Sequence, residues 1–275
     1  MVLEQFLESP YVKRHAFFVL FLSMIYVFIA YGAAYLFFEE SMSLAAVFTL
    51  TILLIPSLHH IISLEEQIER KNGLRHFFRN HATIFKVYFA AFLGILIGFV
   101  MIGALFDSAD IYAYQIDFLT GQSSIGAGAI SKFASGSYVP SFSDVIGLFS
   151  QNLGVMLIAF ALSVFYGAGA VFLVVFNASL FSAFLFSFMN STSKAVASVS
   201  FIHFIPEISG FLLAAIAGAI LSAAIINESF SSPYFKNVMK NTCIMLVFSI
   251  VLVFIGVLLE IYVSGSLIHS LLSGI

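Results

Sequence analysis

Several long stretches of this chain carry no charged side chain, and this feature limits the possible folds more than any other. The stretch Ala16–Phe38 has none, and almost all of its residues are apolar. Five further charge-free stretches are 42–58, 87–106, 152–177, 208–227 and 241–259. About 20 apolar residues are enough for a helix to cross the hydrocarbon core of a bilayer. The pattern therefore predicts a chain that lies mostly in lipid, where the few buried polar residues are candidates for function.

The overall composition supports the same conclusion. Of the 275 residues, 61% are hydrophobic and 9% are charged, whereas soluble domains carry roughly 25% charged residues. In lipid the backbone must satisfy its own hydrogen bonds, which leaves helices or a closed barrel. The apolar stretches do not alternate with period two as barrel strands do. We therefore predict an all-α, polytopic transmembrane helix bundle that forms a single domain over residues 1–275.

The apolar stretches predict about six membrane spans, separated by two longer polar segments. Residues 64–82 form the most polar segment, and residues 106–150 read as a long loop rich in Ser and Gly. The predicted spans are 16–38, 43–63, 83–105, 152–177, 206–227 and 240–263.

Residues 178–204 do not fit this scheme. Ala178–Met189 is apolar but only about half a membrane long, and Asn190–Lys194 then interrupts it. A broken segment at membrane depth is tolerated where it packs against protein or lines a cavity. We predict a re-entrant or half-helix pair near 178–204, with a helix lying on the membrane surface as the alternative.

Lysines and arginines predict the orientation in the cell membrane. Basic residues precede the first span and are concentrated in residues 64–82, whereas the only lysine or arginine in residues 106–150 is Lys132. Cytoplasmic segments are enriched in Lys and Arg, so the N-terminus and residues 64–82 are predicted in the cytoplasm and 106–150 outside. Beyond residue 178 the orientation depends on whether 178–204 crosses or re-enters, and the sequence leaves this open.

The segment His203–Ser209 carries a candidate polar site. Proline suits the first turn of a helix, so the span is predicted to begin at Pro206, with Glu207 in its first turn. A carboxylate there would interact with the positive end of the helix dipole. Alternatively, His203 and Glu207 form a polar pair inside the bundle that holds an ion, a proton or a polar partner.

Three further polar residues lie at the ends of apolar spans. Glu260 is flanked by aliphatic residues, so it must face either protein or the headgroup region. Asn177 could cap its helix or hydrogen-bond to another helix, and Asn152 opens the fourth predicted span.

Small residues at four-residue spacing predict close helix contacts. Gly94 and Gly98 form such a pair in the third span, and Ala214, Gly218 and Ser222 form one stripe in the fifth. Such stripes allow two backbones to approach closely. Packing inside one chain is the favoured interpretation over a dimer interface.

Two short patterns in the polar segment resemble motifs of the intramembrane CAAX-type proteases. Residues 65–70 fit E-E-x-x-x-R and residues 77–81 fit F-x-x-x-H. Both lie in one polar segment, so the favoured interpretation is a solvated amphipathic helix with Glu66 and Arg70 spaced for an i,i+4 pair. The chain has no H-E-x-x-H zinc motif, G-x-S-x-G motif or phosphate-binding glycine loop. We therefore expect no enzyme activity, cofactor, metal site or nucleic-acid partner.

The second half of the chain resembles a known family. The residues that carry the likeness are Gln151-Asn152, 165–170, 177–179, His203-Phe204-Ile205-Pro206-Glu207, 217–222 and 259–262. In this order they resemble the stage II sporulation protein M family, in particular its archaeal branch. The likeness is specific over 151–263. Two residues depart from the family pattern, because Gln151 replaces an Asn and Phe204 replaces the Gly that follows the histidine.

This resemblance implies that His203, Glu207, Asn177 and Glu260 act together. The bacterial namesake is implied to be a membrane scaffold in a peptidoglycan-remodelling complex, although an archaeal-type relative would lack that substrate. We therefore expect a non-enzymatic membrane scaffold or anchoring protein whose partners are the lipid bilayer and other membrane proteins or a second copy. The alternative is a transporter or channel component that uses a polar site at the broken helix.

Overall fold

The structure is a computed structural model that describes residues 16–38, 41–72, 77–106, 111–122, 141–166, 169–191, 194–267 and 270. Every regular element in these ranges is helical, which confirms the all-α prediction. The helices are α3 (Ala16–Phe37), α4 (Met42–Asn72), α5 (Phe77–Leu105), α7 (Ala113–Gln122), α9 (Phe142–Tyr166), α10 (Gly169–Ser191), α11 (Lys194–Asn227), α12 (Pro233–Leu258) and the π-helix η2 (Leu259–Ser264). Residues 1–15, with the basic residues that precede the first predicted span, lie outside the described residues.

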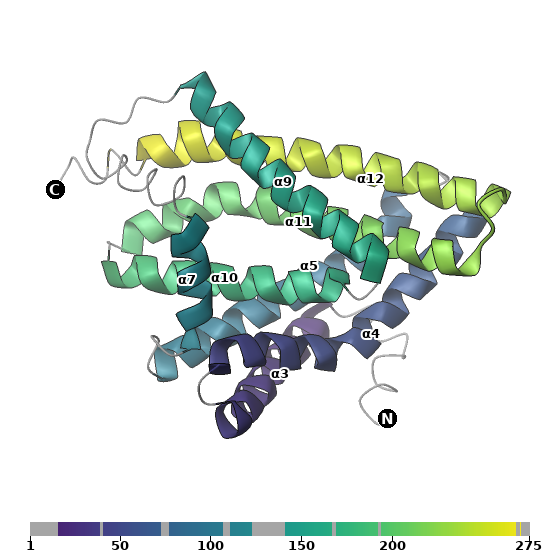
Figure 1. The fold of residues 1–275 in the computed structure, drawn as a ribbon. Coiled ribbons are helices and arrows are strands. Elements are labelled where there is room, and N and C mark those ends of the chain that lie inside the picture. Colours follow the sequence, from purple (N-terminus) through teal and green to yellow (C-terminus); the bar gives the residue numbers. More distant parts are fainter. Residues whose placement is uncertain are drawn as a thin grey trace.

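The helices form one bundle around α11 and α5 (Figure 1). In the apolar windows of α11 and α5, 78% and 67% of the residues are buried, against 17% for α9 and 33% for α3 and α12. α11 packs along α12 and α9, and α5 packs along α3 and α10. The outward faces of α3, α9 and α12 therefore supply much of the apolar surface that meets lipid.

Six helices are long and apolar enough to cross a membrane, which confirms the polytopic prediction. They are α3, α5, α9, α10, α11 and the continuous helix formed by α12 and η2. α4 passes the same test only as a bent pair, Met42–Pro56 and Ile61–Gln67, whose axes differ by 44°. Proline cannot donate a helical hydrogen bond, which explains a bend at this place. Counted as one span, α4 raises the total to seven.

The predicted boundaries of the fourth span were wrong. The apolar stretch 152–177 belongs to two helices, because α9 ends at Tyr166 and α10 begins at Gly169. Glycine is a poor helix former, and Gly169 is the first residue of α10. Residues 178–191 are the second half of α10, and residues 194–204 are the first turns of α11. Two long helices thus replace the predicted re-entrant or half-helix pair.

The predicted start of a helix at Pro206 was also wrong. Pro206 lies inside α11, which begins at Lys194, so Glu207 is more than three turns from the helix start. A proline within a helix removes one backbone hydrogen bond. Transmembrane helices tolerate this loss where neighbouring groups compensate for it.

Residues 106–150 contain more helix than the predicted loop. α9 already begins at Phe142, where Ser141 and Asp144 form a reciprocal capping box: the Ser141 N–H donates to Asp144 Oδ2 and the Asp144 N–H donates to Ser141 Oγ, both at 3.2 Å. Tyr112, directly before α7, contacts α5, because its hydroxyl donates to the Phe99 carbonyl at 2.7 Å. Burial raises the pKa of Tyr112 to about 12, so this hydroxyl remains a neutral donor.

Contacts between distant segments show which helix ends share a side of the bundle. Arg70, near the end of α4, forms an ion pair with Glu228, in the turn between α11 and α12. The Asn237 side chain near the start of α12 donates to the Arg70 carbonyl at 3.3 Å. The end of α4 and the α11–α12 turn therefore lie at one end of the bundle, and the start of α11 and the end of α12 lie at the other (Figure 1).

Candidate functional site

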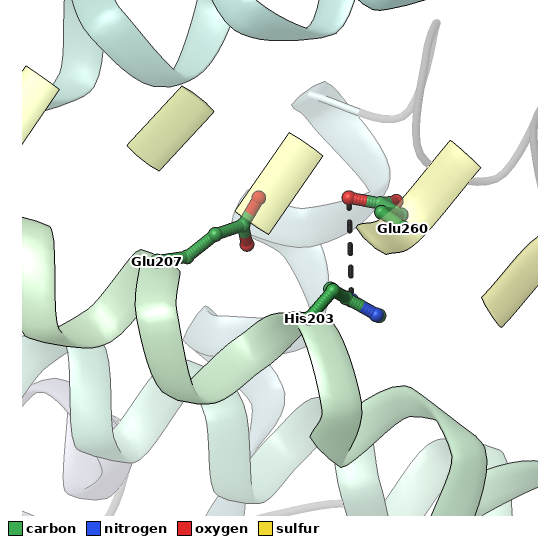
Figure 2. A group of neighbouring side chains, drawn as sticks. All are labelled: His203, Glu207 and Glu260. Carbon is green, nitrogen blue, oxygen red and sulfur yellow. Dashed lines mark ion pairs between the residues drawn. The ribbon is translucent and has the colours of Figure 1, made fainter. Parts of the chain in front are cut away.

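The candidate site lies where the first turns of α11 pass the last turns of α12. His203 and Glu207 are four residues apart on α11, so their side chains occupy the same face of the helix. Both extend toward the helix that carries Glu260 (Figure 2). Glu207 is 8% exposed, and the side chains of His203 and Glu260 are 13% and 23% exposed.

Glu260 stands on a local change of helix type. Leu259–Ser264 adopts π-helical geometry at the end of α12, and it carries both Glu260 and Ser264. π-helical turns within α-helices are rare and occur frequently at functional sites. Here both polar side chains of the segment approach His203.

The hydrogen bonds around His203 indicate which ring nitrogen carries the proton. The Ser264 hydroxyl donates to the Val199 carbonyl at 3.3 Å, and Ser264 Oγ lies 3.0 Å from His203 Nδ1. Since the hydroxyl has one hydrogen, Nδ1 must then be the donor to Oγ. In neutral imidazole this leaves Nε2 as an acceptor with a free lone pair, and Nε2 lies 4.0 Å from Glu260 Oε2.

Glu207 is positioned from two sides. The Asn152 side chain of α9 donates to Glu207 Oε1 at 2.9 Å. On α12, Gly256 lies so close that a Cβ atom built on it would collide with Glu207 Cγ. The glycine therefore leaves the space that the carboxylate side chain occupies between α11 and α12.

The resulting group of two carboxylates and an imidazole is compact. One potential ligand atom from each of His203, Glu207 and Glu260 lies within 4.8 Å of the others. Within the described ranges, neither carboxylate forms an ion pair with a lysine or arginine. Such an arrangement can hold a proton or a cation between its members.

Most of the predicted polar residues come together in this group. The structure brings Asn152, His203, Glu207 and Glu260 to one place, and Pro206 is the neighbour of Glu207 on α11. Ser264 and Gly256 were missed. The four-residue spacing between Glu260 and Ser264 was a signal for the serine, whereas no sequence signal pairs Gly256 with Glu207.

Asn177 has a different environment. Its side chain donates to the Leu173 carbonyl of its own helix at 2.8 Å, so its amide bonds within α10. It also lines an apolar cavity of about 10 Å³ together with Phe92, Ile208 and Leu212. A cavity of this size holds at most about one water molecule. Among the described residues, no hydrogen bond connects Asn177 to His203 or Glu207.

The glycines at four-residue spacing lie at helix contacts inside the chain. A Cβ atom on Gly94 would collide with the Leu20 carbonyl of α3, and one on Gly98 would lie 2.9 Å from Val27 Cβ. A Cβ atom on Gly218 of α11 would lie 2.6 Å from the Phe160 carbonyl oxygen of α9. On the same helix Ala214 and Ser222 are also buried.

A second buried polar group lies at the opposite end of the bundle, and it corrects the solvated interpretation of residues 64–82. Glu65, Glu66 and His81 are 4%, 1% and 5% exposed. Glu65 Oε1 lies 3.2 Å from His81 Nδ1. Glu66 Oε1 lies 3.5 Å from Arg70 Nε, which confirms the predicted i,i+4 pair.

This second group is buried because α4 and α5 fold back on each other and α12 packs across α4. Arg70 also pairs with Glu228 and lies over the Tyr234 ring, 5.8 Å from the ring centre. Polarity along a chain normally indicates exposure, and α12, which packs against α4, is distant in sequence, so the burial of this segment was not predicted. We call Glu65, Glu66, Arg70, His81 and Glu228 the hairpin cluster, and Asn152, His203, Glu207, Glu260 and Ser264 the α11–α12 cluster.

Comparison with known proteins gives one match. A family model described as stage II sporulation protein M matches residues 87–265, roughly two thirds of the chain. The matched region contains the whole α11–α12 cluster, whereas the hairpin cluster lies before it apart from Glu228. Searches of curated proteins and of solved structures found no match.

Proposed function

This chain belongs to the stage II sporulation protein M family, and we propose that it is a non-enzymatic membrane protein that anchors or scaffolds partner proteins in the bilayer. Its six unbroken apolar helices make it a multi-pass membrane protein. The family match and these helices are compatible with several roles, so the proposal rests on the character of the α11–α12 cluster.

The observation that carries the proposal is the close packing of this cluster between three helices. Asn152 of α9 bonds to Glu207 of α11, and Glu207 in turn fills the space left by Gly256 of α12. His203 and Ser264 connect α11 to η2. Polar contacts and small residues are the features that hold transmembrane helices together in a fixed arrangement. A rigid arrangement of α9, α11 and α12 is what a protein needs to present a constant surface to partners.

The outer helices offer that surface. On α9 the large apolar residues Phe142, Ile146, Ile158 and Phe165 are between 55% and 80% exposed. An apolar helix face within the membrane can contact lipid or another transmembrane helix. We propose that partner membrane proteins, or a second copy of this chain, pack against α9.

The basic residues support an orientation with the end of α4 and the α11–α12 turn in the cytoplasm. Because α10 and α11 are two long helices, Lys236 and Lys240 fall at the same end of the bundle as Arg70. Of the seven basic residues in the described ranges, six then belong to segments at or near that end: Arg70, Lys71, Arg79, Lys86, Lys236 and Lys240. This strong bias is the one expected of a cytoplasmic side. The proposed orientation places the N-terminus in the cytoplasm and the end of α12 on the other side.

Transport is the second candidate function, and the acidic character of the α11–α12 cluster favours it. Ionisable residues inside membrane proteins often mark ion or proton pathways. This alternative assumed a broken segment at 178–204, but residues 178–191 complete the long helix α10 and residues 194–204 are the first turns of the long helix α11. The alternative therefore depends on the cluster alone.

The two functions are separated by photo-crosslinking and by reconstitution. A photoreactive phenylalanine analogue is placed at Ile158 or Phe165 on the outer face of α9, and at the buried Phe92 as the control. The scaffold proposal predicts the same protein adduct in native membranes from both outer positions and none from the buried one.

Reconstitution supplies the outcome that would overturn the scaffold proposal. The purified protein alone, in liposomes with an imposed proton or cation gradient, is expected to leave that gradient unchanged. Flux that disappears in folded Glu207→Gln would instead establish transport.

A further inference from the structure

We propose that His203, Glu207 and Glu260 form a binding site for one divalent transition-metal cation, of which Zn²⁺ and Mn²⁺ are the best fits. Neither the family match nor the sequence analysis assigns a metal to this chain. The inference rests on the α11–α12 cluster itself and holds whether the protein is a scaffold or a transporter.

The first argument is the balance of charge. Two carboxylates and one imidazole share a compact space inside an apolar bundle, and one of the carboxylates is more than nine-tenths buried. Burying a charge is highly unfavourable unless the charge is paired or coordinates a metal. In the part of the chain that the structure describes, no lysine or arginine forms an ion pair with Glu207 or Glu260. Without a cation such carboxylates are neutralised by protons, and a divalent cation that displaces these protons would supply the positive charge instead.

Second, hydrogen-bonding neighbours on the far side of His203 and Glu207 orient the ligand atoms toward the site. Metal-binding histidines almost always donate their other ring N–H to an acceptor, which fixes the tautomer and turns the free lone pair toward the metal. His203 Nδ1 has this partner in Ser264 Oγ, and Nε2 faces Glu260. Asn152 occupies Glu207 Oε1 in the same way. The described residues provide no hydrogen bond to the other oxygen, Oε2.

The third argument is the choice of ligand types. One imidazole nitrogen with two carboxylates suits zinc, manganese or iron better than magnesium or calcium, which prefer oxygen alone. Three protein ligands leave at least one coordination position open for water or for a group brought by a partner.

The ligand atoms lie somewhat further apart than in an occupied site. Atoms bonded to one tetrahedral metal at about 2.0–2.2 Å lie about 3.3–3.6 Å from each other. The corresponding limit in this structure is 4.8 Å, so binding needs the widest pair to approach by roughly 1 Å. Glu260 is the most exposed of the three side chains and has the most freedom to provide this movement.

Metal binding is tested on the full-length protein purified in detergent. After treatment with a chelator and its removal, the protein is titrated separately with Zn²⁺, Mn²⁺, Mg²⁺ and Ca²⁺. Bound metal is measured by mass spectrometry of the elements. We expect about one equivalent of Zn²⁺ or Mn²⁺ per chain, with binding of Mg²⁺ and Ca²⁺ at least tenfold weaker. Wild-type protein that is folded by circular dichroism and binds neither Zn²⁺ nor Mn²⁺ would overturn the proposal without any variant.

Glu207→Gln and Glu260→Gln locate the site. Each is expected to weaken binding at least tenfold and to abolish the rise in melting temperature that the metal produces in the wild type. Glu228→Gln is the matched control, because it removes a carboxylate about 30 Å further along α11 at a rise of roughly 1.5 Å per residue. Equal binding by wild type and by folded Glu207→Gln would show that the metal lies elsewhere. Loss of this binding would leave the photo-crosslinking result unaffected, so the metal site and the scaffold function fail independently.

Discussion

Glu66 and Glu207 are both almost inaccessible carboxylates in one apolar bundle, but their neighbours differ in kind. In the hairpin cluster each acid contacts a basic side chain: Glu65 contacts His81, and both Glu66 and Glu228 contact Arg70. In the α11–α12 cluster the described residues give Glu207 one hydrogen bond, from the Asn152 amide, and Glu260 faces His203 at 4.0 Å. The guanidinium of Arg70 carries a permanent positive charge, whereas an imidazole carries one only when it is protonated.

This difference separates a structural cluster from a binding cluster. The charge of a buried acid with a guanidinium partner is balanced within the chain. The Arg70 pairs of the hairpin cluster therefore need no ligand from outside the chain. Among the described residues, the carboxylates of the α11–α12 cluster have no such guanidinium or ammonium partner, so a proton or a cation has to neutralise them. Burial alone does not distinguish the two, but the identity of the partners does.

The largest expected effect tests whether Arg70 is the central residue of the hairpin cluster. Arg70→Met removes the partner of two acids and keeps a side chain of similar length. Breaking a buried pair destabilises by about 3–5 kcal/mol, and the partial exposure of Arg70 reduces this to about 2–4 kcal/mol. Because the chain has no tryptophan, unfolding in detergent is followed by circular dichroism. The exposed Lys236→Met should change stability by less than about 0.5 kcal/mol, and equal effects would contradict the comparison.

Gly256→Ala tests the packing of the α11–α12 cluster. The added methyl group would occupy the place of Glu207 Cγ and push that side chain away from Asn152. Overpacking of this kind destabilises by about 1–3 kcal/mol. Gly154→Ala is the control, since no atom lies within 4 Å of a Cβ built there and alanine favours a helix by about 1 kcal/mol over glycine. A Gly256→Ala protein with wild-type thermal stability would show that Glu207 is not tightly held.

The same chemical change in both clusters gives the sharpest comparison. Glu66→Gln removes one member of an ion pair and should destabilise by about 1–3 kcal/mol. Glu207→Gln removes a buried charge and keeps an oxygen for the Asn152 amide. In metal-free protein it should therefore change stability by less than about 1 kcal/mol. A loss as large as that of Glu66→Gln would mean that the Glu207 charge is already compensated within the chain.

Ser264→Ala has a small expected effect on stability and separates positioning from packing. Loss of one neutral hydrogen bond should destabilise by about 1 kcal/mol, whereas loss of the group that orients His203 should weaken metal binding about 10- to 100-fold. Ser249→Ala removes a buried hydroxyl on the same helix that donates to the Met245 carbonyl of its own helix, and it should leave metal affinity unchanged. Equal metal affinities of the two variants would exclude a positioning role for Ser264.

The sequence predicted the members of the α11–α12 cluster better than their setting. Asn152, His203, Glu207 and Glu260 stood out because a polar residue in an apolar span is conspicuous. The helix start at Pro206 was wrong because proline suits a first turn in isolation, while packing keeps α11 helical on both sides of it. Gly256 could not be recognised, since its importance depends on a side chain of another helix.

The burial of the hairpin cluster was not predicted, because the polarity of its residues was taken as a sign of exposure. Residues 64–82 are polar, and polarity along the chain normally indicates exposure to water. The Glu66–Arg70 pair was predictable from helical spacing alone. The burial of Glu65, Glu66 and His81 was not, because α12, far away in the chain, covers α4.

The sequence by itself determined that most of this chain lies in lipid. It thereby determined the helical architecture, because a backbone in lipid must satisfy its hydrogen bonds within each helix. That requirement is local and can be read from each apolar stretch of about twenty residues. Only the tertiary structure decided where helices break, which polar side chains meet, and whether each buried acid finds a basic partner. Those outcomes depend on contacts between residues distant in sequence, such as Arg70 with Glu228 and His203 with Glu260.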